Sequence, residues 1–232
     1  MSDRKVTQGK EAINDHAEQK RTLIAVPNMG DWKAEFGHSL FNLRKDGEMA
    51  LQQEIGSLVY EARNRLAMTA INSESDYVMW LDADMIFPEN AFLKMREDLE
   101  KPGVDIVSAL YFRRIAPYTP VLYEKLDMSN DGKTVDYAEP KEVPADLFEV
   151  AGVGFGCLLM KTEIFRAVLG KHMQIFTPFA TAGEDLAFCW RARDCGYRIW
   201  CDPTIMCGHV GKQIVTADLF LAYQEAMERG KK

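Results

Sequence analysis

The chain has 232 residues, of which 47% are hydrophobic and 27% are charged, and its formal net charge is -7. This composition suits one globular α/β domain, alone or with a small appendage, and the negative charge excludes a general attraction to nucleic acids or anionic membranes. The first twenty residues contain no apolar stretch typical of a secretory signal, and no apolar run approaches the length of a transmembrane helix. We therefore expect a cytoplasmic protein.

The cysteines do not indicate a disulfide framework, because their number is odd and the chain is not a short secreted one. They also lack the close CxxC pair that is usual in structural zinc sites, so we expect buried, reduced thiols. The five positions are Cys157, Cys189, Cys195, Cys201 and Cys207.

Apolar strand patterns alternate with helical patterns after an N-terminal extension over residues 1–20. The run TLIAV starts at Thr22 and ends at Pro27 and Asn28, which predicts a buried strand followed by a loop. The elements predicted next are a helix over 32–43, a strand over 49–55, a helix over 57–71, a strand over 78–81, a helix over 88–99 and a strand over 104–112.

Segment 113–149 interrupts this alternation, because its prolines and polar residues predict a hairpin or loop excursion at one edge of the sheet. The elements predicted after it are a strand over 152–160, a short helix from 162, a helix over 184–194, a strand over 197–202 and a helix over 216–229. Alternating strands and helices predict an α/β fold of three layers, α/β/α, with a mostly parallel central sheet. We place the catalytic domain over 21–215 and a helical tail over 216–232.

Two aspartates, Asp82 and Asp84, follow the buried run VMWL directly. In an extended chain, residues two apart point to the same side, so we expect the two carboxylates to lie together at the carboxyl end of a strand. Neighbouring carboxylates repel each other unless a cation joins them, and oxygen ligands of this kind suit Mg²⁺ or Mn²⁺. The alternative is a solvated Asp-x-Asp turn.

Two later segments carry further candidates. Glu184 and Asp185 lie in the first turn of a predicted helix, where they either complement the helix dipole or take the proton of an attacking hydroxyl. His209 lies between two glycines after the last strand, either as a structural side chain or as a metal ligand beside the aspartates. Lys212 follows it closely and could neutralise a diphosphate.

The blocks TLIAVPN, EARNRLAMTAI, YVMWLDADMIFP, VDIVSALYFRR, AGVGFGCLLM, GEDLAFCWRARDCGYRIWCDP and GHVG occur in this order between Thr22 and Lys212. In that order they resemble the nucleotide-sugar glycosyltransferases of the glycosyltransferase-A fold. More narrowly, they resemble the short single-domain bacterial and phage-type members near the large family that includes cellulose and chitin synthases. The resemblance implies a hexosyl transfer from a nucleotide diphosphate sugar, with a uridine diphosphate sugar as the default donor and Mn²⁺ or Mg²⁺ as cofactor.

The resemblance also implies roles for individual positions. Asp82, Asp84 and His209 would hold the metal, and the metal would stabilise the leaving nucleotide diphosphate. Asp185 or Glu184 would face the acceptor, and Gly154 would border the sugar pocket. The positions implied to bind the donor are Pro27, Asn28, Arg63, Asp82, Ala83, Asp84, Gly154 and Lys212.

Several alternatives stay open at this level. Aspartate-nucleophile phosphohydrolases also place DxD after a strand, nucleotidyltransferases share the nucleotide-binding logic, and a non-catalytic module could hold a nucleotide or glycan. A late histidine is typical of retaining members of the fold and a GED carboxylate of inverting ones, so the stereochemistry is unassigned. The acceptor is a glycan, a metabolite, a protein or a modified nucleic-acid base. The pair Arg113 and Arg114 either contacts phosphates or is a solvated charge pair.

Overall fold

The computed structural model describes residues 20–56, 58–130, 132–211 and 214–230. The N-terminal extension expected over 1–20 lies outside these residues except for Lys20, and Lys212 lies outside them as well.

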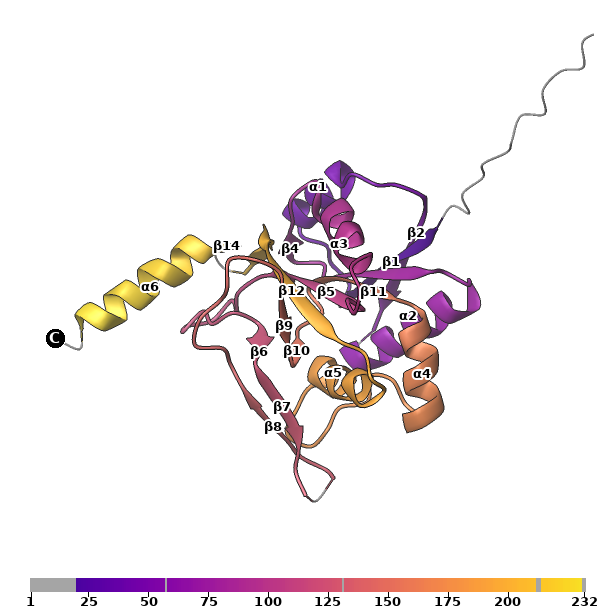
Figure 1. The fold of residues 1–232 in the computed structure, drawn as a ribbon. Coiled ribbons are helices and arrows are strands. Elements are labelled where there is room, and N and C mark those ends of the chain that lie inside the picture. The colour runs from indigo at the N-terminus through magenta and orange to yellow at the C-terminus, as the bar shows by residue number, and fades with distance from the viewer. Residues whose placement is uncertain (1–19, 57, 131, 212–213, 231–232) are drawn as a thin grey trace, which may run out of the picture.

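A seven-stranded sheet forms the centre of the molecule (Figure 1). Its strands are β1 (Arg21–Asn28), β2 (Glu48–Ile55), β3 (Tyr77–Leu81), β5 (Ile106–Leu110), β9 (Phe148–Val150), β11 (Cys157–Lys161) and β12 (Ile199–Met206). They lie in the order β2-β1-β3-β11-β5-β12-β9. All strands except β9 and β11 run in one direction, which confirms the mostly parallel sheet.

Helices cover both faces of the sheet. They are α1 (Ala34–Asn42), α2 (Val59–Asn72), α3 (Ala91–Leu99), α4 (Glu163–His172) and α5 (Glu184–Asp194). Side chains alternate along β3, so Val78 and Trp80 pack with α2, α4 and α5, whereas Met79 and Leu81 pack with α1 and α3. Two apolar clusters therefore lie on opposite faces of one sheet, and the predicted three-layer α/β/α architecture is confirmed.

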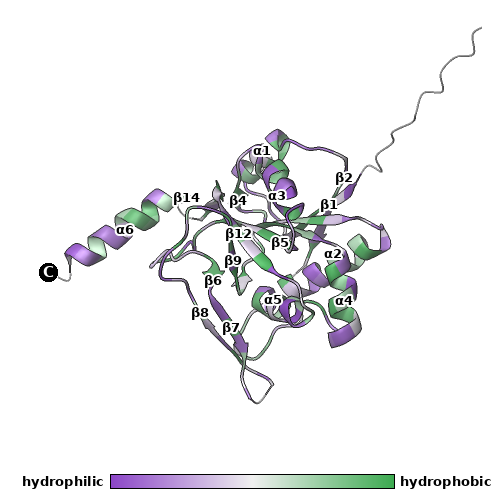
Figure 2. Cartoon of the chain, in the orientation of Figure 1, coloured by the Kyte–Doolittle hydropathy of each residue, from purple (hydrophilic) through white to green (hydrophobic). Residues whose placement is uncertain are grey.

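The predicted excursion is present as short strands beside the main sheet. Strand β6 (Leu122–Tyr123) pairs with β10 (Gly152–Val153), and β7 (Lys125–Met128) forms a hairpin with β8 (Val135–Ala138). Figure 1 shows this hairpin extending from the body, and Figure 2 shows that it is largely hydrophilic, in contrast to the central strands. The last helix, α6 (Ala217–Arg229), extends away from the body, and Phe220 near its start stacks on Phe112 with ring centroids 4.8 Å apart.

A small three-stranded sheet joins segment 208–215 to the residues that follow the aspartate turn. Its strands are β4 (Met85–Ile86), β13 (Gly208–Val210) and β14 (Ile214–Val215). His209 pairs with Met85 in the antiparallel register, and the amide of Val210 donates to the carbonyl of Asp84 at 2.7 Å. This sheet was not predicted from the sequence, because strands of two or three residues carry no measurable periodicity.

The five cysteines are free thiols, and all are buried except the half-buried Cys195. This matches the expectation of reduced, buried side chains. In the part of the chain that the structure describes, every helix is too short or too polar to cross a lipid bilayer.

Candidate functional site

The candidate site lies at the carboxyl ends of three parallel strands of the central sheet, β1, β3 and β5, of which the last two are separated by β11. Strand β1 ends at Asn28, β3 ends one residue before Asp82, and β5 leads into the segment that carries Arg114. Ligands of open α/β sheets bind at this edge, because the loops that leave the strands can diverge there and form a crevice. The three segments are far apart in the chain, but they therefore meet at one edge of the sheet.

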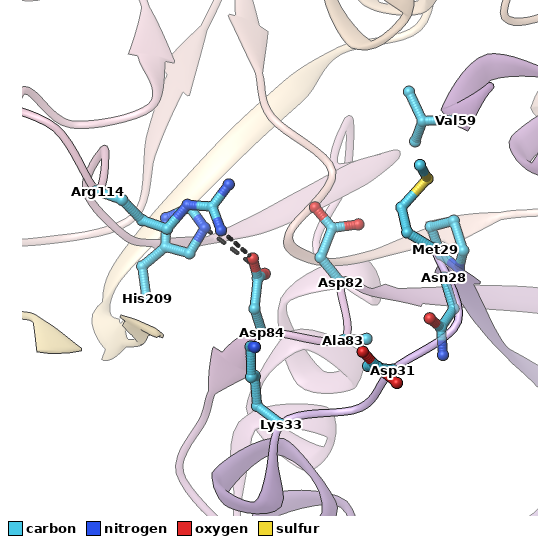
Figure 3. Close-up of a pocket in the computed structure, with 11 residues that line it drawn as sticks. Asn28, Met29, Asp31, Lys33, Val59, Asp82, Ala83, Asp84, Arg114 and His209 are labelled. Atoms are coloured by element: carbon cyan, nitrogen blue, oxygen red, sulfur yellow. Dashed lines mark hydrogen bonds and ion pairs between the residues drawn. The ribbon is translucent and has the colours of Figure 1, made fainter. Parts of the chain in front are cut away.

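A first pocket of about 500 Å³ opens at this edge (Figure 3). The loop after β1 is tied to the aspartate turn, because the amide of Lys33 donates to the carbonyl of Ala83 at 3.1 Å. Five of the predicted donor-binding residues line the pocket with six others. The full set is Pro27, Asn28, Met29, Asp31, Lys33, Val59, Asp82, Ala83, Asp84, Arg114 and His209.

The two aspartates lie in a turn after the strand, which corrects the extended geometry assumed from their spacing, although both side chains line the first pocket. Strand β3 ends at Leu81, and the amide of Met85 donates to the carbonyl of Asp82 at 3.1 Å, so the segment forms a turn. The amide of Asp82 is held by the carbonyl of Gly156 at 2.9 Å. The backbone therefore turns between the two aspartates, and both side chains line the first pocket (Figure 3).

Asp84 faces two basic side chains. Its Oδ1 lies 3.6 Å from Nε2 of His209, and its Oδ2 accepts from Arg114 at 2.7 Å. Burial tends to raise the pKa of Asp84, but the hydrogen bond and charge of His209 and the charge of Arg114 outweigh burial and lower that pKa. Asp84 is thus held as a carboxylate at neutral pH.

The hydrogen bonding of His209 presents one ring nitrogen as a ligand. Nδ1 lies 2.9 Å from the carbonyl of Phe112, which can only accept, so Nδ1 carries the proton. With the proton on Nδ1, Nε2 is the atom that faces Asp84: a charged imidazole donates an N–H there, and a neutral one would offer its lone pair to a cation held between the two side chains. A histidine fixed by a carbonyl in this way is the usual form of a metal-binding histidine. The oxygen and nitrogen donors of Asp84 and His209 fit a divalent cation such as Mn²⁺.

Asp82 is held apart from this pair by a buried arginine. Arg63 donates to Asp82 at 3.0 Å and to Glu184 at 3.2 Å, and its side chain is 4% exposed. Burial raises the pKa of Asp82, Arg63 opposes that rise and the charge of Asp84 adds to it. Among the described residues, no three His, Cys, Asp or Glu side chains form a group that could hold a metal ion. Asp84 thus lies beside His209, whereas Asp82 forms an ion pair with Arg63.

The guanidinium of Arg63 sits in an aromatic setting. It lies 5.5 Å from the ring centre of Trp80 and 5.3 Å from that of Phe155. Arg63 lies behind Asp82 and is absent from the side chains that line the pockets of the site. The structure thus places this predicted donor-binding residue as a support of Asp82 and Glu184.

A second pocket of about 490 Å³ adjoins the first. Asp82, Arg114 and His209 line both pockets, so the two share a wall of charged side chains. The remaining lining residues of the second pocket are Tyr111, Arg113, Ile115, Ala116, Pro117, Val121, Phe155 and Asp185. His209 lines both pockets and Asp84 lines the first, so this pair lies where the two cavities meet.

The two carboxylates at the start of α5 have different surroundings. Glu184 is paired with Arg63, whereas Asp185 faces the second pocket and accepts from the amide of Leu186 at 2.9 Å. Burial, and next the charge of Glu184, raise the pKa of Asp185 to about 6, although Arg63 opposes this. A carboxylate with a pKa near 6 is a competent proton acceptor at neutral pH.

Of the two remaining predicted donor-binding residues, Gly154 and Lys212, the structure describes only Gly154, which does not line the first pocket. Gly154 is buried behind the second pocket, and a side chain there would collide with Oη of Tyr111 and with Val121. A direct donor contact by Gly154 therefore stays a prediction, and its structural role is to leave room for Tyr111. Lys212 falls outside the described residues, so its role also stays a prediction.

Sequence reasoning missed Arg114 as a partner of Asp84, and it missed Asp31 and Lys33 in the first pocket. A signal for Arg114 existed, because it closely follows β5 and so lies at the same edge of the sheet as the aspartates. No comparable pattern marks Asp31 and Lys33, which stand in an irregular loop.

Comparison with known proteins defines the fold. No model of a known protein family matches the sequence. Among solved structures, A197 from STIV superposes with a TM-score of 0.62 at 21% identity, over 85% of this chain and 91% of that one. GalNAc-T7, solved with UDP, GalNAc and Mn²⁺, superposes with a TM-score of 0.56 at 11% identity, over 85% of this chain and 45% of that one. This chain thus spans under half of GalNAc-T7, and its fold is of the glycosyltransferase-A type.

Proposed function

We propose that the protein is a metal-dependent glycosyltransferase that moves a sugar from a nucleotide diphosphate sugar to an acceptor hydroxyl. The observation that carries this proposal is the junction of the two pockets, where Asp84 and His209 lie between one cavity beside β1 and another that contains Asp185. A transfer reaction has to hold the donor and the acceptor side by side, and two adjoining cavities that share a charged centre can do this.

The first pocket suits the nucleotide part of the donor. Pro27 and Asn28 at the end of β1 would contact the base or ribose, and Asp84 and His209 would hold a divalent cation at the diphosphate. When bound, such a cation neutralises the charge that develops on the leaving diphosphate. The structural likeness to a protein solved with UDP and Mn²⁺ supports uridine diphosphate and Mn²⁺ as the first choices.

The second pocket suits the acceptor, because it contains Asp185. In an inverting reaction, the Asp185 carboxylate takes the proton of the acceptor hydroxyl as that oxygen attacks the sugar. In a retaining reaction, the same carboxylate accepts a hydrogen bond from the hydroxyl and orients it. The anomeric configuration of the product, read by NMR, separates the two routes.

A thermal-shift panel tests the donor site. The protein is heated with each nucleoside diphosphate and nucleotide sugar, with and without Mn²⁺, and a shift that needs both the metal and one nucleotide supports the proposal. Release of the nucleotide diphosphate from the stabilising sugar donor then shows turnover, since a pure binding module releases none. Absence of any metal-dependent shift would contradict the proposal.

A separate assay of phosphate release tests the phosphohydrolase alternative. An aspartate-nucleophile enzyme would release inorganic phosphate from phosphomonoesters, and that activity would be lost on substitution of Asp82. Arg63 already occupies the Asp82 carboxylate at 3.0 Å, which favours a held carboxylate over a free nucleophile. The glycosyltransferase proposal therefore expects no phosphate release from a simple phosphomonoester.

A further inference from the structure

Arg114 occupies the position in the site where a cation and a diphosphate would meet. Its guanidinium donates to Asp84 Oδ2 at 2.7 Å, and it lines both pockets. Figure 3 shows it beside His209, on the same side of Asp84. Arg114 therefore lies at the junction and uses an oxygen of the carboxylate that a metal would need.

The two arginines that pair with the aspartates, Arg63 and Arg114, differ in how far their side chains are exposed and so in how easily they can move. The Arg63 side chain is 4% exposed and is packed between aromatic rings, whereas the Arg114 side chain is 48% exposed. A buried ion pair is costly to separate, because each charge would be left without a partner, but an exposed pair can exchange partners at little cost because water solvates the released charges. Arg114 can leave its carboxylate, and Arg63 cannot.

The charge of the first pocket determines when a diphosphate can bind next to Arg114. Its lining contains three carboxylates, from Asp31, Asp82 and Asp84, but only two permanent cations, from Lys33 and Arg114. A diphosphate is repelled by this excess of negative charge until a divalent cation reverses it. Once such a cation holds Asp84, the released guanidinium is the nearest planar donor that can bind phosphate oxygens in the bidentate manner.

We propose that Arg114 is a partner-exchanging residue. It neutralises Asp84 while the cation is absent, and it turns to the donor diphosphate when the cation and the nucleotide bind. This inference rests on the proposed function, but it adds a specific residue and a specific order: Arg114 competes with the cation and cooperates with the nucleotide.

Calorimetric titrations of the whole chain test the two halves of the exchange. In Arg114→Ala without nucleotide, we expect Mn²⁺ to bind about two- to five-fold more tightly than in the wild type, because its competitor at Asp84 is gone. At saturating Mn²⁺, we expect UDP to bind the same variant about ten-fold more weakly or worse, because a charge-assisted phosphate contact is lost. A merely structural role would not move the two affinities in opposite directions.

Arg198→Ala is the matched control. It removes the same charge and an exposed ion pair of similar length, to Glu149 at 2.6 Å, from a residue that lines neither pocket. We expect its affinities for Mn²⁺ and for UDP to equal those of the wild type. Thermal melting of both variants checks that each is folded.

Two contrary results are distinguishable. If Mn²⁺ binds the wild type through Asp84, as shown by its loss in Asp84→Asn, but Arg114→Ala binds Mn²⁺ and UDP unchanged, the exchange is overturned and the proposed function survives. If the wild type binds no Mn²⁺ with or without UDP, both are overturned. Weaker Mn²⁺ binding in Arg114→Ala would also overturn the exchange, because it would make Arg114 a support of the metal site.

Discussion

Nε2 of His209 lies 3.6 Å from Oδ1 of Asp84 because β13 pairs with β4 directly after the aspartate turn. The amide of Val210 donates to the carbonyl of Asp84 at 2.7 Å, so the backbone itself fixes the two side chains at this separation. The pair is therefore built into the sheet, and it does not depend on a mobile loop reaching the site.

We expect Asp84→Asn to abolish metal-stimulated transfer. The amide cannot supply an anionic oxygen to a divalent cation, and the lost ion pair with the exposed Arg114 contributes about 1 kcal/mol or less to stability. The melting temperature without metal should thus stay close to that of the wild type. Activity over a Mn²⁺ titration and a thermal melt check the two statements, and a fully active Asp84→Asn would end the metal-site interpretation.

We expect His209→Ala to weaken the affinity for Mn²⁺, seen as a shift of the activating Mn²⁺ concentration to higher values. The imidazole would supply a nitrogen ligand whose tautomer is set by the carbonyl of Phe112, so its loss should weaken Mn²⁺ binding by about 10-fold or more. His38 lies in the middle of α1 with an exposed side chain and serves as the control for loss of a histidine. An unchanged titration in His209→Ala would return this residue to a structural role.

We expect Asp185→Asn to lower the transfer rate by about 10²- to 10⁴-fold with little change in donor affinity, because the carboxylate faces the acceptor pocket. The rate of the wild type should rise as pH increases through about 6, where Asp185 loses its proton. Steady-state kinetics over pH 5 to 8 check both parts. A change confined to donor affinity would place Asp185 in the donor pocket instead.

The same substitution should stabilise the fold above pH 6. The pKa of Asp185 is raised by burial to about 6, so between pH 4 and 6 the folded state binds more protons than the unfolded state, and stability falls as pH rises. Asparagine does not ionise, so the gain in the free energy of unfolding should be on the order of 2 kcal/mol at pH 7.5 and near zero at pH 4. Urea unfolding at the two pH values measures it, and equal gains would contradict the burial effect.

We expect Arg63→Met to lower the free energy of unfolding by about 3 to 5 kcal/mol, because it leaves two partly buried carboxylates without their shared partner. Arg65 on the same helix is the matched control, since its side chain is 47% exposed and its pair with Glu54 is accessible to solvent. Arg65→Met should cost less than about 1 kcal/mol. Similar losses in the two variants, measured by chemical denaturation, would refute a supporting role specific to Arg63.

Local sequence patterns carried most of the fold. The run from Val78 to Leu81 was predicted as a buried strand because it is apolar throughout, and β3 covers it from Tyr77 to Leu81. Helix α5 begins at Glu184 and ends at Asp194, as its glycine-flanked pattern predicted. Such patterns depend on residues that are close in the chain, so the elements can be predicted without the tertiary structure.

The site itself was legible only in part. The sequence determined that Asp82 and Asp84 follow a strand at the ligand-binding edge, and that His209 lies in a glycine-flanked segment. It did not determine that the aspartates lie in a turn, because this turn is held by the carbonyl of Gly156, which lies just before β11 and accepts from the amide of Asp82. Nor did it determine the partners of these carboxylates, Arg63 and Arg114, since ion pairs between remote segments are set by packing and leave no periodic pattern.

The sequence by itself therefore determined the order of the elements, the layer architecture and the chemistry of the residues at the edge of the sheet. The tertiary structure decided which of those residues meet: Asp84 with His209 and Arg114, Asp82 with Arg63, and Asp185 with the second pocket. The physical reason is that strand propensity and hydrophobic periodicity act over a few residues, whereas the position of a carboxylate relative to a cation depends on how separate segments pack.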